Sequence, residues 1–107
     1  MLILLFFPLF LHAVEKNIFH LTAEEWSGPR TGMRIVMMPG VQSAIKALDK
    51  SPGSTLILKY PGGDVGTIWG EELRSWLLAL GVEMEKMELR PGSPAQDIIE
   101  MEILHGR

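Results

Sequence analysis

The segment between Thr55 and Arg90 places a strand, a helix and a second strand in direct succession. Thr55–Tyr60 (TLILKY) is short, β-branched and aromatic in character, and has Pro and Gly on both sides, which is typical of a strand. Apolar side chains recur on one face over about residues 67–80 and Gly81 follows, which predicts a helix and its end. Met84–Arg90 alternates apolar with charged residues, as a half-buried strand does. Such a unit joins parallel strands by a right-handed crossover, and it commits the chain to an α/β fold.

Weaker patterns precede this unit. Residues 17–21 (NIFHL) are apolar-rich and predict a first strand. Thr22 and Glu25 have the spacing of a capping box, which predicts a brief helix that Gly28-Pro29 stops. Met33–Met38 is apolar, and we expect it to be a strand or an extended lead-in.

A further helix and a last strand complete the pattern. Pro39 suits the first position of a helix, whose apolar face continues through Leu48 and whose end is at Ser51-Pro52-Gly53. Ile98–Leu104 alternates Ile and Met with Glu, which predicts a strand. Because the later strands have one apolar and one charged face, we expect a two-layer α/β sandwich, β-α-β-α-β-β, with helices on one face of a mixed sheet. Residues 14–107 would form this single domain.

The N-terminal run Leu2–Leu11 contains no polar side chain. Ten residues of helix would span about half of a bilayer core, and Pro8 would weaken such a helix further. A short apolar run followed by Ala13 and a polar stretch is typical of a cleavable signal, with cleavage after Ala13. No Lys or Arg precedes the run, and the alternative is an apolar strand or helix packed in the core. Residues 1–13 therefore predict an exported, periplasmic protein that meets the membrane only through this segment.

Composition excludes several classes of function. The chain has no cysteine, which removes disulfides, thiolate catalysis, cysteine-type zinc sites, iron–sulfur clusters and a lipoprotein's lipid-carrying residue. Its net charge is −3, and its Lys and Arg are scattered among acidic neighbours, so nucleic acid is not an expected partner. No cofactor motif is present.

No catalytic or metal-binding arrangement assembles from the sequence. His12, His20 and His105 lack metal-ligand spacing to one another or to a carboxylate. Ser93 stands in a Pro-Gly-Ser-Pro loop without the motif of an activated nucleophile. The acidic pair Glu71-Glu72 is explained by the charge preference of a helix start. We therefore expect a protein that is not an enzyme.

Residues from about Val41 to Ile103 resemble the OmpA-like domain, which is also found at the C-terminus of MotB-type proteins. The resemblance is in the order of elements: a helix, a strand with a Gly-containing turn, a long helix ending in L-x-x-x-G-V, a strand, a loop with Gly and Pro, and a final strand. The matching pieces are Ala47–Pro52, Leu56–Lys59, Leu77–Val82 and Ile99–Ile103. Members of that family bind peptidoglycan in the bacterial envelope, so the resemblance implies a wall-binding module.

The wall-binding motif of that family is degenerate in this chain. The family has a Gly-His-Thr-Asp turn, whereas Tyr60–Asp64 reads YPGGD. The family's carboxylate-binding Arg falls at Trp69, and Arg74 lies one and a half turns later. If wall binding survives, Asp64 and Arg74 should converge on one pocket; we expect them to point apart, or Arg74 to be paired with Glu71.

Two further residues complete the candidate ligand-binding set of Asp64, Arg74, Gly63 and Trp26. Gly63 belongs to a Gly-rich turn that precedes a helix, where backbone N–H groups can hold an anion, but a tight turn explains the glycines more simply. Trp26 lies beside Ser27–Arg30 in a predicted loop. It is either an exposed contact for a partner or glycan, or a plug at one end of the core.

The sequence thus predicts a small exported cell-envelope protein, a non-catalytic binding or accessory module on an OmpA-like scaffold. Its partner would be peptidoglycan or an envelope protein. The alternative is a periplasmic protein–protein interaction subunit without wall binding, which the degenerate motif favours. A small envelope enzyme is the third hypothesis.

Overall fold

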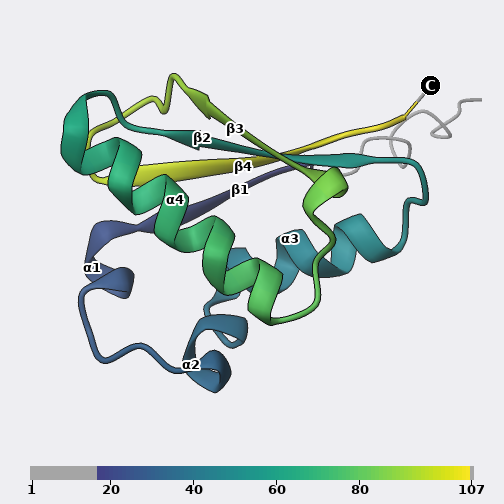
Figure 1. The fold of residues 1–107 in the computed structure, drawn as a ribbon, viewed down its shortest axis with the longest axis horizontal. Helices are drawn as coiled ribbons and strands as arrows, with labels where there is room; N and C mark the ends of the chain where they lie inside the picture. The colour runs from purple at the N-terminus through teal and green to yellow at the C-terminus, as the bar shows by residue number, and fades with distance from the viewer. Residues whose placement is uncertain (1–16, 107) are drawn as a thin grey trace, which may run out of the picture.

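The computed structural model describes residues 17–106, so the predicted signal segment and its cleavage site after Ala13 lie outside the described residues (Figure 1). The elements in chain order are β1 (Ile18–Thr22), α1 (Ala23–Trp26), α2 (Gly32–Val36), α3 (Pro39–Asp49), β2 (Thr55–Tyr60), α4 (Gly63–Ala79), the 3₁₀ turn η2 (Met84–Lys86), β3 (Met87–Pro91) and β4 (Ile98–Leu104).

The strands form one mixed sheet in the order β1-β4-β2-β3. β2 pairs with β3 in parallel, with α4 as the connection, as the sequence predicts. β4 lies between β1 and β2 and is antiparallel to both. The last strand of the chain therefore occupies a central position, where Met101 is opposite both Phe19 and Leu58.

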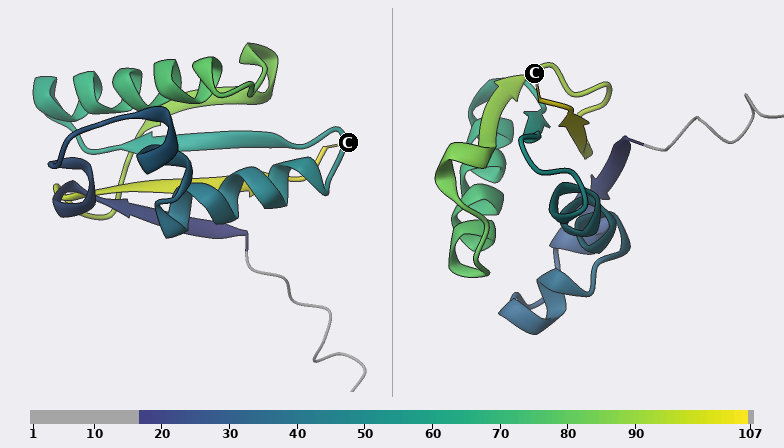
Figure 2. Two further views of the ribbon diagram at one scale, coloured as in Figure 1. Left: turned by 90° about the horizontal axis from the view of Figure 1, so that it is seen from below. Right: turned by 90° about the vertical axis from the view of Figure 1, so that its right-hand side faces the viewer.

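All the helices lie on one side of the sheet (Figure 1). α3 runs beside β1 and β4, and α4 runs beside β2 and β3 (Figure 2). The α/β fold class predicted from the sequence is confirmed. The covered face of the sheet carries the buried side chains of Leu21, Leu56, Leu58, Ile99, Met101 and Ile103. These strand residues and the inner faces of α3 and α4 form one hydrophobic core.

Local sequence signals explain where several helices begin and end. Thr22 and Glu25 form the predicted capping box at the start of α1. Pro39 occupies the first turn of α3, where its missing N–H costs no hydrogen bond. α4 ends at Ala79, and Gly81, which follows the C-cap Leu80, has a φ of 106° that suits glycine. There Gly81 N donates to Leu78 O at 3.0 Å and Val82 N donates to Leu77 O at 2.9 Å, which is a Schellman motif.

Three boundaries differ from the predictions. Met33–Met38 is not a strand: α2 covers most of it, because the Thr31 side chain accepts from Arg34 N and caps a helix. α4 begins at Gly63 and not near residue 67, so the Gly-rich turn forms its first turn. Residues 84–86 form η2, and β3 starts only at Met87, the first residue whose side chain reaches the core.

Candidate functional site

The Gly-rich turn between β2 and α4 is shaped by packing. A Cβ atom added to Gly66 would lie 1.9 Å from the carbonyl oxygen of Pro61, so only glycine lets α4 start this close to the end of β2. Gly63 has a φ of +88°, in the left-handed region. The interpretation of these glycines as parts of a tight turn agrees with this geometry.

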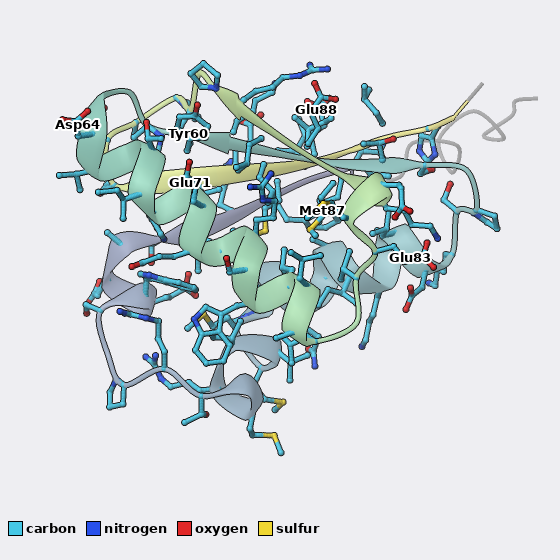
Figure 3. All side chains as sticks on the ribbon, in the orientation of Figure 1. Tyr60, Asp64, Glu71, Glu83, Met87 and Glu88 are labelled. Carbon is cyan, nitrogen blue, oxygen red and sulfur yellow. The ribbon has the colours of Figure 1, made fainter. Side chains whose placement is uncertain are left out.

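Asp64 and Arg74 do not converge. Asp64 lies exposed at the N-terminal end of α4, and Glu71 lies about two turns further along the helix (Figure 3). Arg74 is ten residues after Asp64 on the same helix, which corresponds to about 15 Å along its axis. Within residues 17–106, neither side chain has a hydrogen bond or an ion pair, and Arg74 is not bound to Glu71. The two residues therefore do not form one pocket, which is the expected arrangement for a degenerate motif.

Trp26 does not lie in a loop as predicted: it is the last residue of α1, and it plugs the core with 6% of its surface exposed. Its Nε1 donates to Glu72 Oε1 at 3.4 Å, which ties the end of α1 to α4. The Arg30 guanidinium lies 5.0 Å from the centroid of the indole ring and donates to the carbonyl oxygen of Trp26. Of the two interpretations of Trp26, core packing agrees with this burial.

A groove lies between the loop Ser27–Arg30 and α4. Its volume is about 1120 Å³, and we call it the α4 groove. Ile68, Trp76 and Ala79 supply its apolar lining, and the exposed carboxylates of Glu71 and Glu72 supply negative charge, with Arg30 at the opposite wall.

A smaller hollow of about 330 Å³ extends the α4 groove toward the start of the helix. Trp26 and Trp69 line it together with Val65 and Ile68, which are 82% and 55% exposed. The Trp69 Nε1 is buried and has no hydrogen-bond partner among the described residues. Two exposed aliphatic side chains thus adjoin an open cavity.

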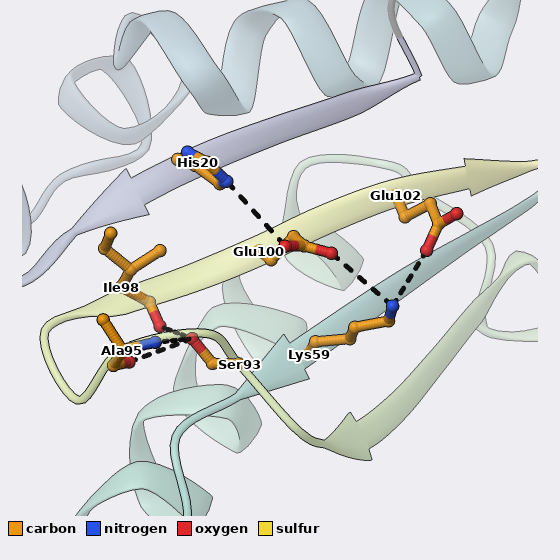
Figure 4. Close-up of polar contacts among 7 residues, drawn as sticks. All are labelled: His20, Lys59, Ser93, Ala95, Ile98, Glu100 and Glu102. Atoms are coloured by element: carbon orange, nitrogen blue, oxygen red, sulfur yellow. Dashed lines mark hydrogen bonds and ion pairs between the residues drawn. The ribbon is translucent and has the colours of Figure 1, made fainter.

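The uncovered face of the sheet carries a charged cluster that the sequence analysis did not assign. Lys59 Nζ lies 3.0 Å from Glu102 Oε1 and 3.5 Å from Glu100 Oε2 (Figure 4). The hydrogen bond and the charge of Glu102 raise the pKa of Lys59, and Glu100 adds to this. His20 Nε2 is 3.9 Å from Glu100 Oε1. The strand alternation places these groups on one face, but only the register aligns them into a cluster.

The remaining nucleophile and base candidates have structural partners. The Ser93 hydroxyl donates to the carbonyl oxygens of Ala95 and Ile98 and so holds the loop before β4 (Figure 4). His105 Nδ1 lies 2.9 Å from Ser51 Oγ, and its Nε2 lies 3.2 Å from Asn17 Oδ1. The sequence contains no signal for these two contacts of His105, because Asn17, Ser51 and His105 belong to distant segments.

Among the residues that the structure describes, no group of three or more His, Asp or Glu side chains could hold a metal ion. Within residues 17–106, none of the helices has the length and apolar character needed to cross a membrane. The chain matches no protein-family model, no curated protein and no solved structure.

Proposed function

We propose that this chain is a small exported module of the cell envelope that binds a protein partner through the α4 groove and performs no chemistry of its own. Export rests on the N-terminal segment Leu2–Leu11, as the sequence analysis argues. The observation that carries the binding proposal is the α4 groove itself. It is an open cavity between the loop Ser27–Arg30 and α4, flanked by exposed aliphatic side chains of α4.

The lining of the α4 groove defines the chemistry of the partner. Ile68 and Trp76 offer apolar contact area, and aromatic side chains are common anchors of binding energy at interfaces. Glu71 and Glu72 add two negative charges with no ion-pair partner among the described residues. The complementary partner is a segment that presents apolar and basic side chains together, such as an amphipathic basic helix.

The scaffold proposal rests on the resemblance to OmpA-like domains. The observed elements from α3 to β4 follow the order that the resemblance implies, which supports an OmpA-like scaffold. Wall binding in that family implies an Asp and an Arg in one pocket, whereas Asp64 and Arg74 are separated along α4. The separation favours a protein partner over peptidoglycan.

Site-specific photo-crosslinking in cells tests this proposal. A photoreactive residue at position 68 should form a discrete adduct with one envelope protein, and a photoreactive residue at position 104, on the uncovered sheet face, should not form that adduct. The substitution Glu71→Lys should abolish the adduct by reversing charge inside the groove. Glu83→Lys is the matched control, because Glu83 is an exposed carboxylate outside the groove (Figure 3). Equal loss with both variants, or no discrete adduct at position 68, would refute the groove as the binding surface.

Co-sedimentation with isolated peptidoglycan sacculi tests the competing hypothesis. The purified chain should stay in the supernatant. Pelleting with sacculi that is lost in Asp64→Ala and retained in the matched variant Asp49→Ala would establish a wall-binding module and overturn the proposal. Asp49 is an exposed carboxylate at the end of α3 and controls for the loss of one negative charge.

A further inference from the structure

A second pocket, which shares no lining residue with the α4 groove, lies between the C-terminal half of α3 and the ends of β1 and β4. Its volume is about 590 Å³. Ser43 and Lys46 line it from α3, and Lys50 lines it from the C-cap of that helix; spacings of three and four residues put the three on one face. Asn17 and His105 line it from the strand side.

The charge of this pocket is opposite to that of the whole chain. The net charge of the chain is −3, yet Lys46 and Lys50 stand in the pocket and none of its lining residues is acidic. Lys59 and Arg90 on the uncovered sheet face have carboxylate partners. Lys46 and Lys50 have none within the described residues, so their ammonium groups are available to an external anion.

A hydrogen-bond chain fixes the polar groups around the pocket. Ser54 Oγ donates to Ser51 Oγ at 2.7 Å, and Ser51 Oγ contacts His105 Nδ1. Because Asn17 Oδ1 can only accept, His105 Nε2 carries the proton in that contact. The Asn17 amide is thereby oriented with its Nδ2 hydrogens free to donate.

We propose that this pocket binds a phosphate group, either as free phosphate or as the headgroup of an anionic phospholipid. Two ammonium groups one helical turn apart match an anion of charge near −2, and the Ser43 hydroxyl and Asn17 Nδ2 add neutral donors from two elements. A carboxylate, with two oxygens and one charge, would use fewer of these four donors. This site is independent of the α4 groove and of the function proposed for it.

Titration of the ¹⁵N-labelled chain with inorganic phosphate, followed by NMR against sodium chloride at equal ionic strength, tests the site. Amide shifts should saturate at Asn17, Ser43 and Lys50. Lys50→Gln should weaken binding about threefold to tenfold, since it removes one charge-assisted contact. Lys86→Gln removes a lysine outside the pocket and should change the affinity less than about twofold.

Shifts that do not saturate, or equal weakening by Lys50→Gln and Lys86→Gln, would show only general charge screening and overturn the proposal. Ser43→Ala adds a neutral test, because it removes a donor without changing the net charge, and it should also weaken binding.

A second experiment, with lipid vesicles, distinguishes a phospholipid headgroup from free phosphate as the ligand. The full chain is pelleted with phosphatidylglycerol vesicles, and Lys50→Gln is compared with Lys86→Gln so that the N-terminal segment is the same in every sample. A selective loss of pelleting in Lys50→Gln, reversed by competing inorganic phosphate in the wild-type chain, assigns the headgroup as the ligand. Equal pelleting of both variants, together with the phosphate shifts, assigns free phosphate.

Discussion

Apolar side chains on the two faces of the sheet are shielded from water by different groups. On the covered face, α3 and α4 pack rigid apolar side chains against Leu58 and Met101. On the uncovered face no helix is present among the described elements (Figure 1). The charged side chains of Lys59, Glu100 and Glu102 lie there instead. Yet Ile57, which points to the uncovered face, is only 1% exposed.

The register explains how Ile57 is buried without a covering helix. It lies opposite Glu102 on one neighbouring strand and Glu88 on the other. Lys59, two residues along its own strand, reaches across to both Glu100 and Glu102. Long charged side chains cover apolar surface with their methylene stems and keep their charges in water. Burial by flexible stems should tolerate change better than burial by packed helices, and this difference can be measured.

Leu58→Ala should have the largest effect, because it opens a cavity that helices on the covered face cannot fill. We expect a loss of about 4 kcal/mol in the free energy of unfolding. Urea denaturation followed by circular dichroism measures it. Leu104→Ala, at an exposed position of β4, is the control and should cost less than about 1 kcal/mol. Similar losses in the two variants would contradict the assignment of Leu58 to the core.

Gly66→Ala should have the next largest effect, a loss of about 3 kcal/mol in the free energy of unfolding. The new methyl group would meet the Pro61 carbonyl oxygen and push α4 away from the covered face. Gly62→Ala is a matched control because no atom lies within 4 Å of its added Cβ and its φ of −66° suits alanine. Thermal unfolding should show a lower midpoint for Gly66→Ala alone. A wild-type midpoint in that variant would mean that the helix start yields without cost.

Periodicity predicted most of the covered face. The alternation in Thr55–Tyr60 and Ile98–Leu104 and the apolar stripe that contains Leu73 and Leu77 identified the side chains that meet in the core. Met33–Met38 was assigned wrongly because a run of six residues with five apolar side chains fits a strand or a buried helix turn equally well. The Thr31 cap decides between them, and its hydrogen bond is visible only in the structure.

The candidate sites were less predictable than the fold, because they depend on contacts between distant segments. The separation of Asp64 and Arg74 follows from their ten-residue spacing once both belong to α4. The pocket for which we propose phosphate binding could not be predicted from the sequence. Its lining residues Asn17, Lys50 and His105 come together only through the pairing of β1 with β4 and the packing of α3. No local sequence motif indicates that these three residues lie close together.

Ile57→Ala tests the uncovered face directly. We expect a loss of about 2 kcal/mol, below that of Leu58→Ala, because the stems of Lys59 and Glu102 can move into the space that the side chain leaves. The same urea experiment provides the comparison. A loss equal to or above that of Leu58→Ala would show that the charged stems pack as rigidly as the helices do.

Lys59→Met should have the smallest effect near neutral pH, below about 1 kcal/mol, because the ion pairs with Glu100 and Glu102 are partly exposed and screened by solvent. Lys86→Met, at a lysine with no ion-pair partner among the described residues, should change stability less than Lys59→Met.

The pH dependence of Lys59→Met separates the charge of Lys59 from its packing. Glu102 raises the pKa of Lys59 in the folded protein above the ordinary value of 10.5, so the folded state binds the proton more tightly than the unfolded state does. The stabilisation is complete below that ordinary value and is lost as the pH rises through the higher folded pKa. The difference in unfolding free energy between wild type and Lys59→Met should therefore be constant at neutral pH and shrink as the pH rises above the ordinary pKa of 10.5. A difference that stays constant through this rise would mean that the methylene stem of Lys59 over Ile57, and not its charge, stabilises the uncovered face.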